Sequence, residues 1–193
     1  MTRSAAIRDR VAGAILDVAA DLLAGGGDPP SMATIAAAAG VGRATLYRYF
    51  PTREQLLHAL GDAARDATAR RLAEADLDAV PVTEAIARIA RVVAAGGSKY
   101  AALVSRFGVS DYASDAEQQI GAMIRALLSR GVEDGTLRDD LTVDELAFLL
   151  GSLLQAAARM TAEHAAGVEK AAALVTSVFL HGTQRRQDAA AAG

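Results

Sequence analysis

The sequence predicts an all-α fold of about nine helices, and three observations support this prediction. Hydrophobic residues make up 52% of the 193 residues, which is enough for a sizeable core. Aromatic residues are only 4%, so the apolar mass is mainly Ala, Leu, Val and Ile, and alanine is the best helix former. Apolar positions recur at spacings of three and four along most of the chain, and no long segment is rich in β-branched residues.

The N-terminal third is divided into short segments by residues that begin or end helices. Ser31 is a typical N-cap, and Gly40 ends the helix it begins, because glycine readily adopts the left-handed conformation of a helix C-cap. Pro51 stops the next helix, and Thr52 with Gln55 forms a capping box that begins a long fourth helix. We therefore expect helices over residues 5–24, 32–39, 43–49 and 53 to about 75.

The rest of the chain shows the same period, interrupted by glycines and capping residues. The pair Gly96-Gly97 predicts a break between two helices, since glycine is a poor helix former. Thr142 and Glu145 form a second capping box, and Gly167 separates the last two helices. The expected helices cover residues 82–95, 98–108, 115–133, 143 to the break at Gly167, and 168–181.

Charge and composition indicate which partners, sites and cellular location the protein can have. The net charge is -3, but residues 1–71 carry nine Arg against seven acidic residues, whereas residues 72–193 carry eleven basic against sixteen acidic residues. A mildly basic N-terminal part suits a chain in which only this part contacts the phosphates of a nucleic acid. Cysteine is absent, which excludes disulfides and thiolate sites. We see no secretory pattern and no apolar run that could span a bilayer, and we expect a soluble cytoplasmic protein that does not contact membranes.

Residues 31–50 carry the strongest functional signal, because they read as two short helices joined by a tight turn. Ala36 and Ala39 are small enough to let the helices cross closely, and Gly40 permits a positive φ in the turn. The apolar residues spaced to point into the domain are Met32, Ile35, Val41, Leu46 and Phe50. This pattern predicts a helix-turn-helix.

The second of these helices presents groups that suit DNA. Its outward residues are Arg43, Ala44, Thr45, Tyr47, Arg48 and Tyr49. Such side chains hydrogen-bond base edges, meet a thymine methyl group or hold phosphates. Two of them also have a structural interpretation, since Tyr47 could pack as well as touch a phosphate and Arg48 could be a solvated surface charge.

The motif resembles the TetR family of bacterial regulators over about residues 5–60. The matching residues are Ser31, Ile35-Ala36, Ala39-Gly40-Val41, Thr45-Leu46-Tyr47, Tyr49-Phe50 and Arg53-Glu54-Gln55-Leu56. Two positions depart from the family pattern: Arg53 stands where the family usually has Lys, and Gly42 replaces the usual Ser or Thr cap of the recognition helix.

The resemblance implies a role for each residue of the motif. Arg43, Ala44 and Thr45 would face bases in the major groove, and Arg53 would hold a phosphate at the start of the fourth helix. The other residues of the expected DNA-binding set are Ser31, Thr34, Tyr47, Arg48 and Tyr49. It also implies a helix-turn-helix domain over residues 4–60 and a C-terminal ligand-binding and dimerisation domain over residues 61–187.

The C-terminal helices are expected to pair two subunits and to enclose a small molecule. The last two helices have broad apolar faces with alanines that permit close approach, which suits a four-helix interface in a homodimer. Such a dimer would read a pseudo-palindromic DNA operator with half-sites one helical turn apart. Candidate ligand-lining residues are Tyr100, Leu103, Phe107, Tyr112, Met123 and Phe148.

The sequence therefore favours a repressor that a small-molecule effector releases from DNA. A helix-turn-helix regulator without an inducer, controlled by a partner or acting as an activator, stays open as the alternative. A helical enzyme is disfavoured, because no convergent nucleophile or acid-base pair is found. The three histidines lack ligand spacing, so we expect neither a metal nor another cofactor.

Overall fold

The computed structural model describes residues 3–24, 29–107 and 115–184, with the side chains of residues 3–9, 24 and 97–107 left aside. Within these ranges the chain forms eight α-helices and one short 3-10 helix. The elements are α1 (Arg3–Ala24), α2 (Met32–Ala38), α3 (Arg43–Tyr49), α4 (Arg53–Ala73), η1 (Leu77–Ala79), α5 (Val82–Phe107), α6 (Asp115–Glu133), α7 (Val143–Ala162) and α8 (Val168–Thr183). The all-α prediction is confirmed, with a helix count close to the expected nine.

The predicted break at Gly96-Gly97 is wrong, because α5 runs without interruption from Val82 to Phe107. A glycine in a helix interior costs about 1 kcal/mol relative to alanine, and tertiary packing can offset that amount. At Gly96 a Cβ would lie 3.6 Å from the Thr68 hydroxyl, so α4 passes close to α5 at this point. The two helices expected over 82–95 and 98–108 are therefore one.

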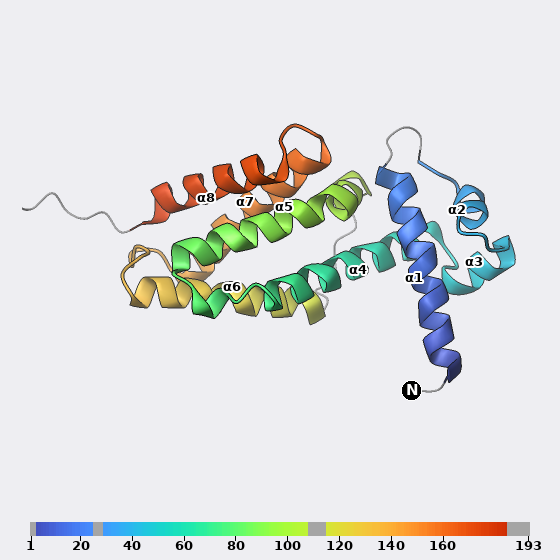
Figure 1. Ribbon diagram of the computed structural model, residues 1–193, viewed down its shortest axis with the longest axis horizontal. Coiled ribbons are helices and arrows are strands. Elements are labelled where there is room, and N and C mark those ends of the chain that lie inside the picture. Colours follow the sequence, from blue (N-terminus) through green and yellow to red (C-terminus); the bar gives the residue numbers. More distant parts are fainter. Residues whose placement is uncertain (1–2, 25–28, 108–114, 185–193) are drawn as a thin grey trace, which may run out of the picture.

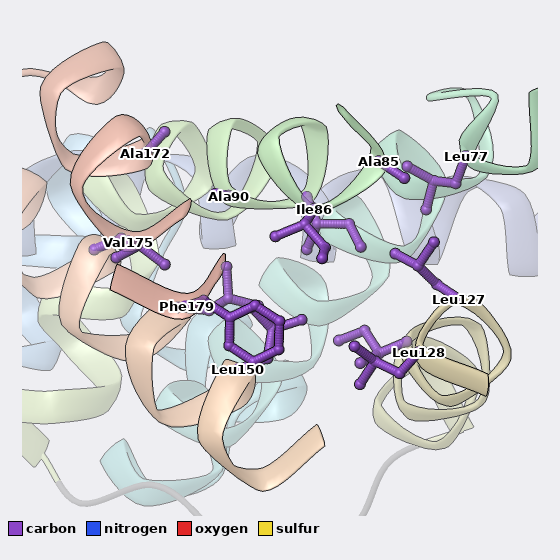
Figure 2. Close-up of a cluster of buried hydrophobic side chains, with 14 of the residues drawn as sticks. Leu77, Ala85, Ile86, Ala90, Leu127, Leu128, Leu150, Ala172, Val175 and Phe179 are labelled. Atoms are coloured by element: carbon purple, nitrogen blue, oxygen red, sulfur yellow. The ribbon is translucent and has the colours of Figure 1, made fainter. Parts of the chain in front are cut away.

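Two separate cores hold the chain together. The smaller core joins α1, α2, α3 and the start of α4, with Ile15, Ile35 and Leu46 fully buried. The larger core lies in the bundle formed by α5, α6, α7 and α8. Figure 2 shows Ile86, Leu128, Leu150 and Phe179, one from each of these helices, turned toward a common centre.

Helix α4 belongs to both cores and so connects them. Leu56 and Leu60 near its start are buried in the smaller core, whereas Leu72 near its end is buried in the larger one. In Figure 1, α4 extends from the group of α1, α2 and α3 along the bundle.

None of the helices in the described ranges combines the length and the hydropathy that a membrane span requires.

Candidate nucleic-acid interface

The turn between α2 and α3 has the geometry that the sequence predicts. Ser31 caps α2 by accepting a hydrogen bond from the Thr34 backbone N–H at 3.1 Å. Gly40 then takes a φ of +67°, and the Val41 N–H donates to the Ala36 carbonyl at 3.0 Å. This left-handed residue turns the chain sharply into α3, and a residue with a Cβ would be strained there.

Buried side chains fix which face of α3 is presented to the outside. Leu46 is fully buried, and Phe50, the C-cap residue of α3, is buried beside it in the smaller core. Met32 and Ile35 on α2 complete the contact, and Val41 packs at its edge. The five apolar residues predicted to point inward do so. Because these anchors occupy one side of a helix of only seven residues, the remaining side chains of α3 face outward.

The outward face of α3 carries the predicted base-reading and phosphate-holding groups. Arg43, Ala44 and Arg48 are exposed, and Tyr47 is 47% exposed. Thr45 and Tyr49 are half-buried, and the Arg48 guanidinium lies 5.4 Å from the Tyr49 ring centre, in a cation–π contact. Of the two interpretations of Tyr47, its exposure favours a group that is accessible to a partner over a core aromatic.

The N-terminus of α2 adds two hydroxyls beside this face. The Ser31 and Thr34 hydroxyl oxygens lie 2.8 Å apart, and both side chains are exposed. One of the two hydroxyls donates its hydrogen to this contact, and the other keeps its hydrogen for a phosphate oxygen. Gly42 begins α3 without a side-chain cap, as the sequence predicts.

Arg53 lies where expected, as the first residue of α4, but its side chain turns toward the protein. Its Nη1 atom donates to the Pro30 carbonyl, and its Nη2 atom is buried. Nothing in the sequence pattern signals this contact, because the two residues are 23 positions apart.

Helices α7 and α8 expose large apolar side chains. Phe148 is 76% exposed, and Leu149, Leu174 and Val178 are 43%, 47% and 51% exposed. Phe148 was expected to line a ligand site, but it faces away from the bundle because the helical period of α7 turns Leu146 and Leu150 inward instead. Large exposed apolar side chains on a protein surface are typical of sites that contact another protein.

Of the other expected ligand-lining residues, the structure describes the side chain of Met123 alone. Met123 is half-buried against the larger core. The side chains of Tyr100, Leu103 and Phe107, and the whole of Tyr112, lie outside the described residues. A groove of about 490 Å³ lies elsewhere, between α5 and α8, and its lining includes Arg91, Ala172, Thr176, Leu180 and His181.

Comparison with known families covers most of the chain. Residues 15–60 match the family described as "Bacterial regulatory proteins, tetR family". Residues 83–184 match the family described as "Transcriptional regulator SbtR-like, C-terminal domain". The first match contains the helix-turn-helix, and the second contains α6, α7, α8 and nearly all of α5.

Individual relatives agree with these families. The HTH-type transcriptional repressor LfrR of Mycolicibacterium smegmatis is 44% identical over 84 residues, an alignment that spans 42% of this chain and 43% of that repressor. The crystal structure of LfrR from Mycobacterium smegmatis with proflavine has a TM-score of 0.69 and 25% identity, covering 91% of this chain and 97% of LfrR. A TetR-family structure from Shewanella sp. PV-4 has a TM-score of 0.66 and 21% identity, over 91% of this chain and 99% of that one. The chain belongs to the TetR family of transcriptional regulators.

Proposed function

We propose that this regulator is a repressor, which binds operator DNA as a homodimer in the cytoplasm and leaves the DNA when a small molecule binds its C-terminal domain. The exposed face of α3 carries the proposal, because Arg43 and Arg48 project from a short helix whose opposite side is anchored by Leu46. Among the described residues, the Arg43 guanidinium has no partner within the chain, which leaves its hydrogen-bond donors for a base edge.

The proposed DNA contacts divide into base and phosphate contacts. Arg43, Ala44 and Thr45 lie in the first turn of α3 and would enter the major groove. The groups proposed to hold phosphates are Ser31, Thr34, Tyr47, Arg48 and Tyr49, all of which are at least partly exposed. The unit that does this comprises residues 4–60, and residues 61–187 form the ligand-binding and dimerisation unit. The two separate cores support that division.

The proposed dimer forms through α7 and α8. Phe148, Leu149, Leu174 and Val178 give these helices an apolar face that water disfavours, and two copies of the face would bury each other in a four-helix arrangement. Symmetry would then place two copies of α3 about one DNA turn apart, to match a pseudo-palindromic operator.

Release is proposed to work by a shift between two states. The ligand would bind near Tyr100, Leu103, Phe107, Tyr112 and Met123, and would favour a state in which α4 has rotated. The LfrR structure with bound proflavine supports a small-molecule effector for this chain. A coupling free energy of about 1–3 kcal/mol would weaken DNA binding about 5–150-fold.

A gel shift with the purified protein and the DNA upstream of its own gene tests the proposal. We expect a sequence-specific complex with two subunits per site at moderate salt, which excess unrelated duplex does not displace. Proflavine is the first effector to add, because it binds LfrR. Absence of a specific complex would exclude the repressor proposal, whereas a complex that no added compound weakens would exclude only its ligand response.

A further inference from the structure

Arg53 joins two parts of the DNA-binding unit that are distant in sequence. It is the first residue of α4, and its Nη1 atom donates to the carbonyl of Pro30, the residue directly before the cap of α2. The bond therefore ties the beginning of α4 to the beginning of α2. The side chain is half-buried, and its Nη2 atom is shielded from solvent.

The recognition helix lies between these two tied ends. α3 has only seven residues, too few to be stable as an isolated helix, so its orientation comes from packing and from the chain on either side. On one side it follows α2 through the turn at Gly40, and on the other it leads through Pro51 and Thr52 into α4. Joining Pro30 to Arg53 closes this stretch into a ring that contains α3.

The inward position of the guanidinium is not the one that a phosphate contact needs. Because the Nη2 atom is shielded from solvent, a phosphate can reach it only if the side chain moves and releases the Pro30 carbonyl, and a hydrogen bond from a charged group is costly to lose. The planar fork of arginine can serve several partners at once, which the single ammonium of lysine cannot do equally well.

We propose that Arg53 is a positioning residue for operator binding and not a phosphate ligand. It holds the beginning of α2 against the beginning of α4, so that α2 and α3 move with α4 as one body. A rotation of α4 then moves α3 by the same angle, because the orientation of α2 and α3 relative to α4 does not change. This inference rests on the proposed DNA-binding function, and it replaces the phosphate role that the family resemblance implies for this position.

Two substitutions at Arg53 test the inference. Arg53→Lys keeps the charge and suits a phosphate contact, so a phosphate role predicts unchanged affinity. The positioning role predicts an affinity loss of about tenfold, because a charge-assisted hydrogen bond is weakened in the free protein. Arg53→Met removes the charge while filling a similar volume. In both variants, circular dichroism first checks that the helix content is retained.

The salt dependence of binding by Arg53→Met separates the two roles further. Each lost phosphate contact reduces the slope of log K against log salt concentration by about 0.9, hence by about 1.8 for a two-subunit complex. The positioning role predicts lower affinity with an unchanged slope. Arg48→Met is the reference variant, because Arg48 is exposed on α3, and it shows how much the slope changes when an arginine of the DNA-facing helix is neutralised.

Hydrogen exchange without DNA gives a readout independent of the operator. Arg53→Met should exchange faster than the wild type at the amides of Thr34 and Ile35 in the first turns of α2. Wild-type affinity in Arg53→Lys, a slope reduced by about 1.8, or unchanged exchange would each overturn the positioning role. If the wild type itself binds no operator, the proposed function fails, and the exchange experiment still decides whether Arg53 orders α2.

Discussion

The guanidinium of Arg130 on α6 donates to the backbone oxygen of Leu77 at 2.8 Å, in the connection between α4 and α5. It also donates to the carbonyls of Asp78 at 2.9 Å and Val80 at 3.1 Å. One side chain thus serves three carbonyls of a connection that has little regular structure of its own. The connection that follows α4 is thereby bound to α6.

Replacing Arg130 should therefore destabilise the protein. Arg130→Met removes three hydrogen bonds from a side chain that is 32% exposed, and we expect the free energy of unfolding to fall by about 1–3 kcal/mol. Urea unfolding followed by circular dichroism measures the loss. Arg125→Met on the same helix is the control, because Arg125 makes an exposed ion pair with Asp144, worth about 0–1 kcal/mol. Equal losses in the two variants would contradict the proposed anchoring.

Gly131 should not tolerate a side chain. A Cβ at this position would lie 2.8 Å from Leu137 Cδ1 and 2.9 Å from Val82 Cγ1, both buried. We expect Gly131→Ala to lower the free energy of unfolding by about 1–3 kcal/mol, since a packed core must shift to admit it. Gly13→Ala in α1 meets nothing within 4 Å and should be neutral or stabilising by up to about 1 kcal/mol. Thermal unfolding of the two variants compares them, and a stabilised Gly131→Ala would show that the contact relaxes freely.

Arg43 should contribute specificity. Arg43→Ala is expected to cost about 1–3 kcal/mol of operator binding, concentrated at particular base pairs of each half-site. Competition with a set of single-base operator variants measures this distribution. Arg70→Ala, which removes the same charge from an exposed site near the far end of α4, should leave binding nearly unchanged. A loss spread evenly over all operator variants would assign Arg43 to a phosphate instead.

Phe148 should stabilise the dimer. Burying its side chain is worth about 1.5–3 kcal/mol per subunit, so Phe148→Glu should raise the dimer dissociation constant more than a hundredfold. Light scattering over a dilution series measures the change. Ala126→Glu, an exposed site on α6, adds the same charge away from the proposed interface and should leave the dimer intact. A Phe148→Glu variant that stays dimeric at the wild-type concentrations would place the interface elsewhere.

The capping box of α7 should make stability depend on acidic pH. The Thr142 N–H donates to Glu145 Oε2 at 2.7 Å, and this bond lowers the pKa of Glu145 below its ordinary value of 4.5. The cap is therefore fully stabilising above the pKa of the unfolded chain, and its contribution is lost as pH falls through the lowered pKa of the folded state. Glu145→Gln cannot titrate, so its unfolding free energy should fall less than that of the wild type between about pH 5 and pH 3. Parallel curves from urea titrations would contradict this.

Local signals account for most of what the sequence predicts correctly. Ser31, Thr52 and Thr142 were predicted to cap helices, and each hydroxyl accepts the backbone N–H three residues later. Gly40 was predicted to have a positive φ, which it does. These features depend on residues within one turn of each other, so the order of side chains along the chain suffices to predict them.

Contacts between distant segments were beyond the same reasoning. The break predicted at Gly96-Gly97 does not occur, because α4 packs along α5 there. Phe148 was predicted to line a ligand site, although only the phase of α7 against its neighbours decides which residues of that helix are covered. The contact between Arg53 and Pro30 has no local signal at all.

By itself, the sequence determined the helices of the DNA-binding unit, their caps and the set of side chains on the outer face of α3, because helical period and capping chemistry act over a few residues. Only the tertiary structure decided that α5 is one helix, that Arg53 turns inward and that Arg130 holds the connection between α4 and α5. Those outcomes depend on which surfaces meet when the helices pack, and the packing free energy of distant residues then outweighs preferences of about 1 kcal/mol in the local chain.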